Sequence, residues 1–403
     1  FVQGRNEEME TWEGKRLGPE GAKQQFGAEE AFLYEEYESL APKLLSGIED
    51  IYCDYTNAAF EKYDKKLINT AIPYDQRGSS FSKATLNSLS PLLSELRLIK
   101  SSEELENLKR ACDITVEGHK SAMEFTKKDM YEYQIEAEME KTFYDLGAER
   151  LGYPSIVASG DNACILHYST NREKVDNNGL ILIDAAAEFK MYSSDVTRTF
   201  PVNGKFTKVQ QDVYTEVLKA QEIGIKNVTT KKTMSDIHTS TVASISQSLV
   251  DLGLVPMGVE ETISMMHYFE FFMHGTGHWL GLDVHDAGTT EEKNKPRKLK
   301  PGMVTTIEPG IYIRPNKPEI EFKLLERDPK KIRERRKSLG MEKATKLESE
   351  EMKDAKSIKH KIPKDLLGIG IRIEDDIVCT ENDPINLTIG APKTIDDVEA
   401  ICS

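Results

Sequence analysis

The sequence lacks three features that would place it in well-known classes of protein. Its 403 residues contain only five cysteines, and none of them stands in a Cys-x-x-Cys pair. No apolar run approaches the ~20 residues that a membrane-spanning helix requires. Basic residues are in the minority, with 53 against 68 acidic ones and a net charge of −15. The chain is therefore not predicted to be disulfide-stapled, to span a membrane or to bind nucleic acid.

Composition and length narrow the remaining classes. The odd number of scattered cysteines favours a reducing compartment, so we expect a cytoplasmic protein. The acidic balance favours cations or neutral to positively charged small molecules as partners, although a solvated surface explains most of it. A chain of 403 residues can bury a large core, and its length predicts two or more domains.

A domain boundary is expected near Lys100. Residues 1–99 show an αβ-like pattern without a cluster of candidate catalytic groups, and we interpret them as a smaller, truncated α/β N-terminal domain. Ser101, with Glu104 three positions later, forms a capping box that begins a helix. Helices mixed with antiparallel-looking strands predict an α+β domain over 100–403. The further helices are predicted at 207–224 and 235–252, and the strand-like runs are 155–158, 180–183, 192–200, 304–307 and 369–379.

A highly charged segment interrupts this second domain at about 315–367. It contains Lys330-Lys331, the basic run 333–337 and the acidic run 348–351, between two strand-like pieces. We interpret the segment as a solvated helical or mobile insertion. A docking role for its basic cluster is the alternative.

The most unusual stretch of the chain is 272–286, which reads FMHGTGHWLGLDVHD. It holds three of only eight histidines, His274, His278 and His285, with glycines and apolar residues between them. Imidazoles this dense beside apolar residues are typical of a walled cleft that ligates, donates and accepts protons. Any one of these histidines alone would more simply be a core or surface residue. The trio with its glycines points to a functional site.

Four carboxylates are attached to hydrophobic strand-like runs, where an unpaired charge would be costly. They are Asp184, Asp195, Glu308 and Glu374. The two aspartates are 11 positions apart across a turn-like segment at 188–190, a spacing that lets a short hairpin bring them together. For a lone strand carboxylate, an ion pair with Arg198 or Arg372 is the simpler interpretation. Four such acids together with the histidine stretch favour hard divalent cations, which take mainly oxygen ligands.

The order of these residues and the words around them resemble one known family. The words are ILIDAAAE, SDVTRTFPVNGKF, FFMHGTGHWLGLDVHD, PGMVTTIEPGIYI and GIGIRIEDDIV. They resemble the aminopeptidase P (Xaa-Pro aminopeptidase) branch of the pita-bread metallopeptidases, to which prolidase and methionine aminopeptidase also belong. The resemblance implies a pita-bread catalytic domain over 100–403, with two pseudo-equivalent α+β halves and the metals between them. It implies a partial creatinase-like N-terminal domain over 1–99.

The resemblance also implies a role for each site residue. A pair of manganese-like ions, Mn²⁺ with Zn²⁺ or Co²⁺ as alternatives, would be held by Asp184, Asp195, His278, Glu308 and Glu374. Asp184 would be a bidentate ligand of one ion, His278 and Glu308 would bind the other, and Asp195 and Glu374 would bridge. Glu308 would also accept a proton from water. His167 matches a histidine near the scissile bond, His274 and His285 match two that line the substrate site and assist proton transfer, and Arg372 matches an arginine beside the bridging glutamate.

The implied activity is removal of the N-terminal residue from peptides whose second residue is proline, by a hydroxide that bridges the two ions. The nearest alternative is a prolidase, which shares the five ligands and cuts only Xaa-Pro dipeptides. A non-catalytic pita-bread binding module is the alternative from another class, and the full set of ligands argues against it. We expect a homodimer or larger homo-oligomer. Because residues 396–403 resemble organellar members, a mitochondrial location is the alternative to the cytoplasm.

Overall fold

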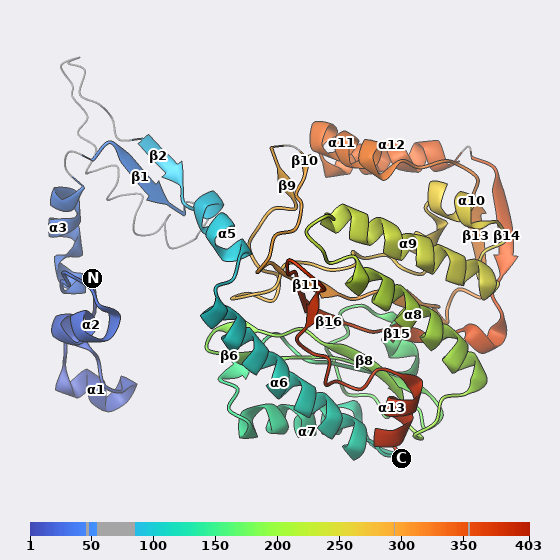
Figure 1. Ribbon diagram of the computed structural model, residues 1–403, viewed down its shortest axis with the longest axis horizontal. Coiled ribbons are helices and arrows are strands. Elements are labelled where there is room, and N and C mark those ends of the chain that lie inside the picture. Colours follow the sequence, from blue (N-terminus) through green and yellow to red (C-terminus); the bar gives the residue numbers. More distant parts are fainter. Residues whose placement is uncertain (46–47, 55–84, 294, 354) are drawn as a thin grey trace. The chain divides into compact units, whose positions relative to one another are not determined.

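The computed structural model describes residues 1–45, 48–54, 85–293, 295–353 and 355–403. Within these ranges the chain forms two compact units, Phe1–Ser94 and Glu95–Ser403 (Figure 1). The N-terminal domain predicted at 1–99 and the insertion predicted at 315–367 both include residues outside this description, so their bounds stay predictions. The described ranges contain no disulfide and no helix with the length and apolar character needed to cross a bilayer.

The first unit consists of short helices and one parallel strand pair. Asn6 caps the first helix by accepting a hydrogen bond from Met9 N, and Gly27 ends the second in the left-handed conformation. Asp50 of β1 lies opposite Thr85 of β2. The elements are α1 (Glu7–Glu13), α2 (Gly18–Phe26), η1 (Tyr34–Glu36), α3 (Tyr37–Leu44), β1 (Asp50–Cys53), β2 (Thr85–Ser88) and α5 (Ser90–Leu98), which crosses the boundary.

The second unit begins with the predicted capped helix. The Ser101 hydroxyl accepts a hydrogen bond from Glu104 N at 3.3 Å, and the Glu104 carboxylate accepts one from Ser101 N at 2.8 Å. In this half, β5 lies between β4 and β8 in an antiparallel sheet. This first half comprises α6 (Ser102–Phe125), α7 (Glu132–Asp145), β3 (Arg150–Leu151), β4 (Ile156–Ser159), η3 (Gly160–Cys164), β5 (Leu180–Asp184), β6 (Ala187–Phe189), β7 (Tyr192–Ser193) and β8 (Thr197–Pro201).

A second half repeats this combination of a helix pair with antiparallel strands (Figure 1). The helices predicted at 207–224 and 235–252 are present, and capping boxes at Thr207 and Thr233 begin them. Here β16 lies between β11 and β17. The elements are α8 (Lys208–Lys226), α9 (Met234–Asp251), α10 (Val259–Ser264), η4 (His267–Glu270), β9 (Glu291–Glu292), β10 (Lys295–Pro296), β11 (Val304–Ile307), β12 (Gly310–Tyr312), β15 (Gly370–Arg372), β16 (Asp375–Val378), β17 (Ile385–Asn386) and α13 (Ile395–Ile401).

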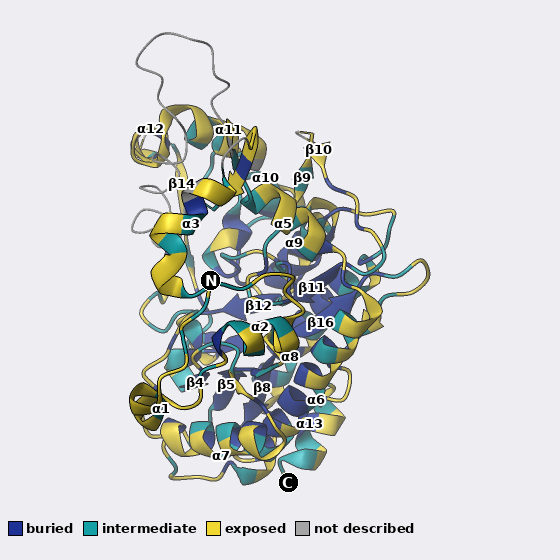
Figure 2. Ribbon diagram, turned by 90° about the vertical axis from the view of Figure 1, so that its left-hand side faces the viewer, coloured by how far each residue is buried: buried dark blue, intermediate teal, exposed yellow. Residues whose placement is uncertain are grey.

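The charged segment between β12 and β15 is largely helical in its described residues. It comprises β13 (Glu319–Lys323), α11 (Pro329–Leu339), α12 (Met341–Lys353), β14 (Ser357–Lys361) and η5 (Lys364–Leu366). β13 and β14 pair in antiparallel fashion, with Lys323 opposite Ser357. Arg335 and Glu351 form an ion pair at 2.8 Å that joins the two helices, which are mostly exposed (Figure 2). The segment therefore leaves and rejoins the rest of the unit through one strand pair.

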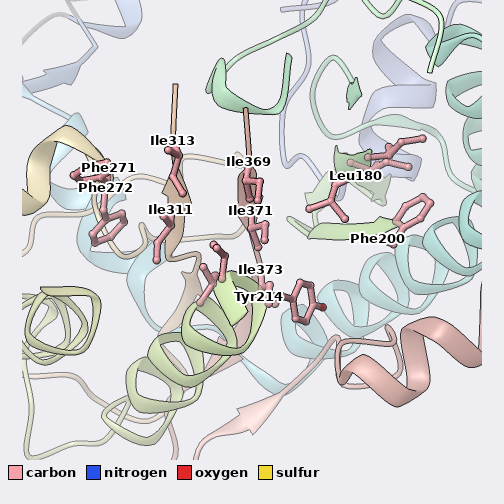
Figure 3. Close-up of a cluster of buried hydrophobic side chains, with 14 of the residues drawn as sticks. Leu180, Phe200, Tyr214, Phe271, Phe272, Ile311, Ile313, Ile369, Ile371 and Ile373 are labelled. Atoms are coloured by element: carbon pink, nitrogen blue, oxygen red, sulfur yellow. The ribbon is translucent and has the colours of Figure 1, made fainter. Parts of the chain in front are cut away.

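The main hydrophobic core joins the two halves. Figure 3 shows Ile311 and Ile371, from the paired strands β12 and β15, in one cluster with Phe272, Leu180 and Phe200. All five side chains are at most 4% exposed, and burial of this kind contributes roughly 1.5–3 kcal/mol for each large apolar side chain. The core holds β5, β12 and β15 in fixed relative positions.

Two strand-like runs predicted as continuous are interrupted. The run 192–200 is broken at 194–196, and the run 369–379 is broken at Ile373 and Glu374. The interruptions contain Asp195 and Glu374, two of the predicted ligands. A carboxylate in the middle of a buried strand would be surrounded by apolar side chains. The interruption in strand pairing lets it point toward polar groups instead.

Candidate active site

A cavity of about 550 Å³ in the second unit gathers all nine predicted site residues. They are His167, Asp184, Asp195, His274, His278, His285, Glu308, Arg372 and Glu374. The remaining wall includes apolar side chains from Pro154, Ile156, Leu166 and Val284. The sequence prediction of which residues meet is thus matched by the geometry, whereas the role of each residue stays a prediction.

In the first half, a hairpin brings Asp184 and Asp195 together. Asp184 is the last residue of β5 and lies opposite Thr197 of β8, two positions after Asp195. The hairpin turns at Lys190 and Met191, whose φ angles of 47° and 70° are typical of a tight two-residue turn. The turn was predicted slightly too early, at 188–190, because Glu188 and Phe189 still pair as part of β6.

In the second half, a strand pair does the same for Glu308 and Glu374. Glu308 directly follows β11 and Glu374 directly precedes β16, and these strands pair with Ile307 opposite Asp375. Glu374 N donates to Thr197 O at 3.1 Å, so the backbone of one half is bonded to that of the other at the site. Each half therefore supplies two carboxylates from neighbouring strand ends.

Backbone pairing places His278 beside β11. Thr306 N donates to His278 O at 3.0 Å, and Trp279 forms an isolated bridge with Thr305. A Cβ atom at Gly277 would lie 1.8 Å from Thr306 O, so only glycine permits this close approach. Gly277 is therefore required for the packing of the histidine stretch against β11.

The orientation of the His278 ring suits a metal ligand. Nδ1 lies 3.0 Å from Trp279 O, so it donates to this carbonyl and the lone pair of Nε2 faces the carboxylates. Nε2 lies 3.3 Å from Asp195 Oδ2 and 3.8 Å from Glu308 Oε1. Two electron-rich atoms this close require a proton or a cation between them. Ligand atoms of Asp195, His278 and Glu374 all lie within 4.8 Å of one another.

The electrostatics of the cavity also fit divalent cations. Burial, followed by neighbouring negative charge, raises the pKa of Asp195 and of Glu374. Burial raises the pKa of Glu308 to about 8. For His278, burial favours a lower pKa, but the hydrogen bond to Asp195 and nearby carboxylate charges outweigh it and raise the pKa to about 9. These shifts reflect excess negative charge, which bound cations would compensate.

Arg372 begins a hydrogen-bonded chain that ends at His274. Its guanidinium donates from Nη2 to Asp184 Oδ2 and from Nη1 to Tyr312 Oη at 3.0 Å. Tyr312 in turn donates to His274 Nε2 at 2.9 Å, and His274 Nδ1 donates to Gly275 O at 2.8 Å. Burial, followed by the charge of Arg372, lowers the pKa of His274 to about 3. His274 is therefore a neutral imidazole.

Tyr312 and Tyr153 are site residues that the sequence prediction missed. Tyr153 Oη lies 2.6 Å from Asp184 Oδ1 and 2.5 Å from Asp195 Oδ1, so its hydroxyl joins the two aspartates. Burial, followed by the charges of these aspartates, raises its pKa well above the usual value. Neither tyrosine has a periodicity or spacing in the sequence that distinguishes it from a core residue.

The two arginines considered as ion-pair partners behave differently. Arg372 pairs with Asp184, as the simpler interpretation of that carboxylate expected. Arg198 pairs instead with Asp375 at 2.6 Å, and both side chains are fully buried. One arginine therefore offsets part of the charge of four carboxylates, and Arg198 offsets none of it directly.

His167 and His285 are the more exposed histidines of the cavity wall. The His285 ring lies 4.2 Å from the His278 ring, at an interplanar angle of 70°. Burial, followed by the charge of His278, lowers the pKa of His285. The next residue, Asp286, accepts a hydrogen bond from the buried Lys100 Nζ at 2.9 Å, which anchors this end of the histidine stretch.

Comparison with known proteins agrees with this geometry. Residues 106–381 match metallopeptidase family M24, and residues 1–52 match the aminopeptidase P N-terminal domain. The Xaa-Pro aminopeptidase of Haemophilus influenzae is 36% identical over 99% of this chain and 80% of its own length, and the human Xaa-Pro aminopeptidase 3 is 30% identical over 100% and 70%. The solved structure of Pseudomonas aeruginosa aminopeptidase PepP superimposes with a TM-score of 0.86 at 35% identity, covering 100% of this chain and 81% of that one.

These matches confirm the α+β pita-bread fold and the family predicted from the sequence words. The match to family M24 covers both halves of the second unit, and therefore all four carboxylates of the site. The chain belongs to metallopeptidase family M24, within its aminopeptidase P group.

Proposed function

We propose that this chain is a metalloaminopeptidase that hydrolyses the peptide bond between an N-terminal residue and a following proline. The observation that supports this best is the convergence of two aspartates, two glutamates and four histidines on one cavity. The names of its relatives point the same way, since the proteins from Haemophilus influenzae and Escherichia coli are Xaa-Pro aminopeptidases. A solved relative, aminopeptidase P from Escherichia coli, holds the inhibitor Pro-Leu.

The metals are proposed to be two divalent ions, Mn²⁺ with Zn²⁺ or Co²⁺ as alternatives. Asp184, Asp195, His278, Glu308 and Glu374 would hold them, because these side chains offer hard oxygen donors and one imidazole lone pair in a site with excess negative charge. When bound, such ions acidify a shared water and polarise the peptide carbonyl.

The protein side chains supply the proton transfers and the orientation. Glu308 lines the cavity beside His278 and the other carboxylates, a position from which its carboxylate could accept a proton from water. Neutral His274 lies with Nδ1 3.6 Å from Glu308 Oε2 and can stabilise a neighbouring oxygen or amine without bringing another charge. His167 and His285, on the more open wall, are proposed to meet the departing proline nitrogen and the peptide chain.

A comparison of peptide lengths tests this proposal. We expect Xaa-Pro-Xaa tripeptides and longer peptides to be hydrolysed with Mn²⁺ present, and matched peptides with alanine at the second position to be poor substrates. Activity confined to Xaa-Pro dipeptides would contradict the proposal in favour of a prolidase. No hydrolysis of either class, with or without added Mn²⁺, would favour the non-catalytic binding module.

Two further expectations belong to this proposal. We infer a homodimer or larger homo-oligomer, which sedimentation analysis of the purified chain would test. A cytoplasmic location, with the mitochondrion as the alternative, would be tested by fractionation of cells that express the complete protein.

A further inference from the structure

Glu132 is a buried carboxylate that contacts no cationic side chain in the part of the chain that the structure describes. It is the first residue of α7, and none of its surface is exposed. Oε1 accepts hydrogen bonds from Ser159 N at 2.9 Å and from Asn162 Nδ2 at 3.0 Å. Oε2 accepts from Tyr168 Oη at 2.7 Å and from Glu173 N at 3.0 Å. Four neutral donors thus surround one carboxylate.

This arrangement explains how the carboxylate can be buried. An isolated charge in the interior is costly, but hydrogen bonds from well-placed donors stabilise the ionised form. The positive end of the α7 helix dipole adds to this, because Glu132 is its first residue. The four hydrogen bonds therefore stabilise the buried carboxylate, and they also hold the four donor residues in place.

The four donors belong to one loop, and His167 lies in the middle of it. Two donors, at Ser159 and Asn162, precede His167, and two, at Tyr168 and Glu173, follow it. Tyr168 is the direct neighbour of His167 and is buried, whereas His167 itself is exposed and lines the cavity. Glu132 thus anchors both sides of the loop segment that presents His167.

The loop is also fixed from the opposite side. A Cβ atom at Gly370 would lie 2.3 Å from Ala163 O, so η3 packs directly on the backbone of β15. Arg372, which pairs with Asp184, is two residues further along β15. The loop therefore lies between the Glu132 anchor and the strand that carries part of the metal site.

We propose that Glu132 is a positioning residue that sets the placement of His167 against the substrate. This inference rests on the proposed function, because it concerns how His167 meets the peptide. Glu132 does not line the cavity and makes no hydrogen bond to any of the five predicted ligands in the described residues. Its effect on the reaction must pass through the loop and not through the metals.

The test begins with the Glu132→Gln variant. Glutamine has the same shape, but its amide nitrogen must face either Ser159 N or Glu173 N, and a backbone N–H cannot turn away as a hydroxyl can. The hydrogen bond from one of these two backbone N–H groups is then lost, and that end of the loop is no longer held by residue 132. We expect kcat/KM for an Xaa-Pro-Xaa peptide to fall about 10- to 100-fold, as misplacement by about 1 Å does, with unchanged bound metal.

Glu136→Gln is the matched control. Glu136 lies one turn further along α7 and, among the described residues, accepts a single hydrogen bond, from Asn171 Nδ2 at 2.8 Å. The amide oxygen of glutamine can accept the same bond, so kcat/KM should stay within about twofold of the parent.

A double-mutant cycle with His167→Ala separates positioning from general destabilisation. If Glu132 acts through His167, Glu132→Gln should have little further effect in the His167→Ala background, whereas a general effect on the fold would be additive. Tyr168→Phe, which removes one of the four donors, should show the same dependence on His167 with a smaller loss, and it decides the question if Glu132→Gln does not fold.

Four outcomes would overturn the inference. They are full activity of Glu132→Gln, an equal loss of activity with and without His167, loss of bound metal in Glu132→Gln, and full activity of His167→Ala. If the parent chain hydrolyses no Xaa-Pro peptide, the proposed function itself has failed, which is a different result.

Discussion

The two halves of the second unit bring paired carboxylates together over very different lengths of chain. In the first half, Asp184 and Asp195 are joined by the short hairpin β6–β7. In the second, Glu308 and Glu374 are separated by β12, the whole charged segment and β15. Both pairs nevertheless stand at the ends of adjacent antiparallel strands. Strand register, and not separation in sequence, determines the geometry of the site.

The comparison also explains why a long segment can be inserted in one half. The strand pairs β12–β15 and β13–β14 close the segment off from the ligands, and loop closure costs little more for a long connection than for a short one. In the first half, the connection is a tight turn of only two residues, and both of them have positive φ.

Removal of a ligand from either half should have the largest effect. Glu374→Ala should lower kcat about a thousandfold or more, since a metal centre contributes several kcal/mol to transition-state stabilisation. The fold should be largely retained, because the removed carboxyl group is buried among other carboxylates that repel its charged form. Circular dichroism and steady-state kinetics would check both points. Glu381→Ala, an exposed position after β16, is the control, and a fully active Glu374→Ala would show that the ligand set is wrong.

Tyr312→Phe should have the next largest effect. It removes the hydroxyl that accepts from Arg372 and donates to His274, while the ring and its packing remain. We expect kcat to fall about tenfold, the size of one lost hydrogen bond to a charged group. Kinetics with saturating metal would measure this, and an unchanged kcat would exclude a catalytic use of the chain from Arg372 to His274.

The stability of chelator-treated protein should fall as the pH rises from 7 to 9. The pKa is raised to about 8 for Glu308 by burial, to about 8 for Asp376 by burial and the charge of Asp195, and to about 9 for His278 by its carboxylate neighbours against the effect of burial. Each of these groups holds a proton in the folded state that the unfolded chain has already released, so the stability is lost as the pH passes through these values.

Thermal unfolding would measure the effect as a decrease in Tm of about 5 °C over this range. Saturating Mn²⁺ should flatten the profile, because the cations replace the protons, and Glu308→Gln should reduce the slope without metal. A Tm that is constant or rises with pH in the chelated protein would contradict this account of the cavity.

Removal of the two helices α11 and α12 should have the smallest effect on activity. Replacement of residues 324–356 by Asn-Gly would join β13 to β14 through a tight turn, as in the first half. We expect kcat/KM to stay within about threefold of the parent, because none of the described residues of the deleted segment lines the cavity. A large loss of activity in a variant that still folds would show that the segment contributes to the site after all.

Local signals in the sequence predicted the elements well. Ser101 and Glu104 identified the start of α6, because a capping box needs only neighbouring residues. The nine residues that line the cavity could be named from the sequence because each matches a position of the family. Eight of them lie in the five words quoted above, and His167 lies outside those words.

Contacts formed only in the folded chain were not predictable. The hydroxyls of Tyr153 and Tyr312 find their partners through tertiary packing. The same holds for Glu132, whose donors lie 27 to 41 positions away along the chain. The exact end of β6 was missed for a related reason, since the turn position depends on pairing with β7.

A metal count on the purified chain tests the central claim most directly. Mass spectrometry of protein incubated with Mn²⁺ and then freed of excess metal should give about two ions per chain. The same measurement on Glu374→Ala should give fewer. A parent chain that retains no divalent metal after this treatment, while remaining folded, would contradict the assignment of these five side chains to a binuclear site.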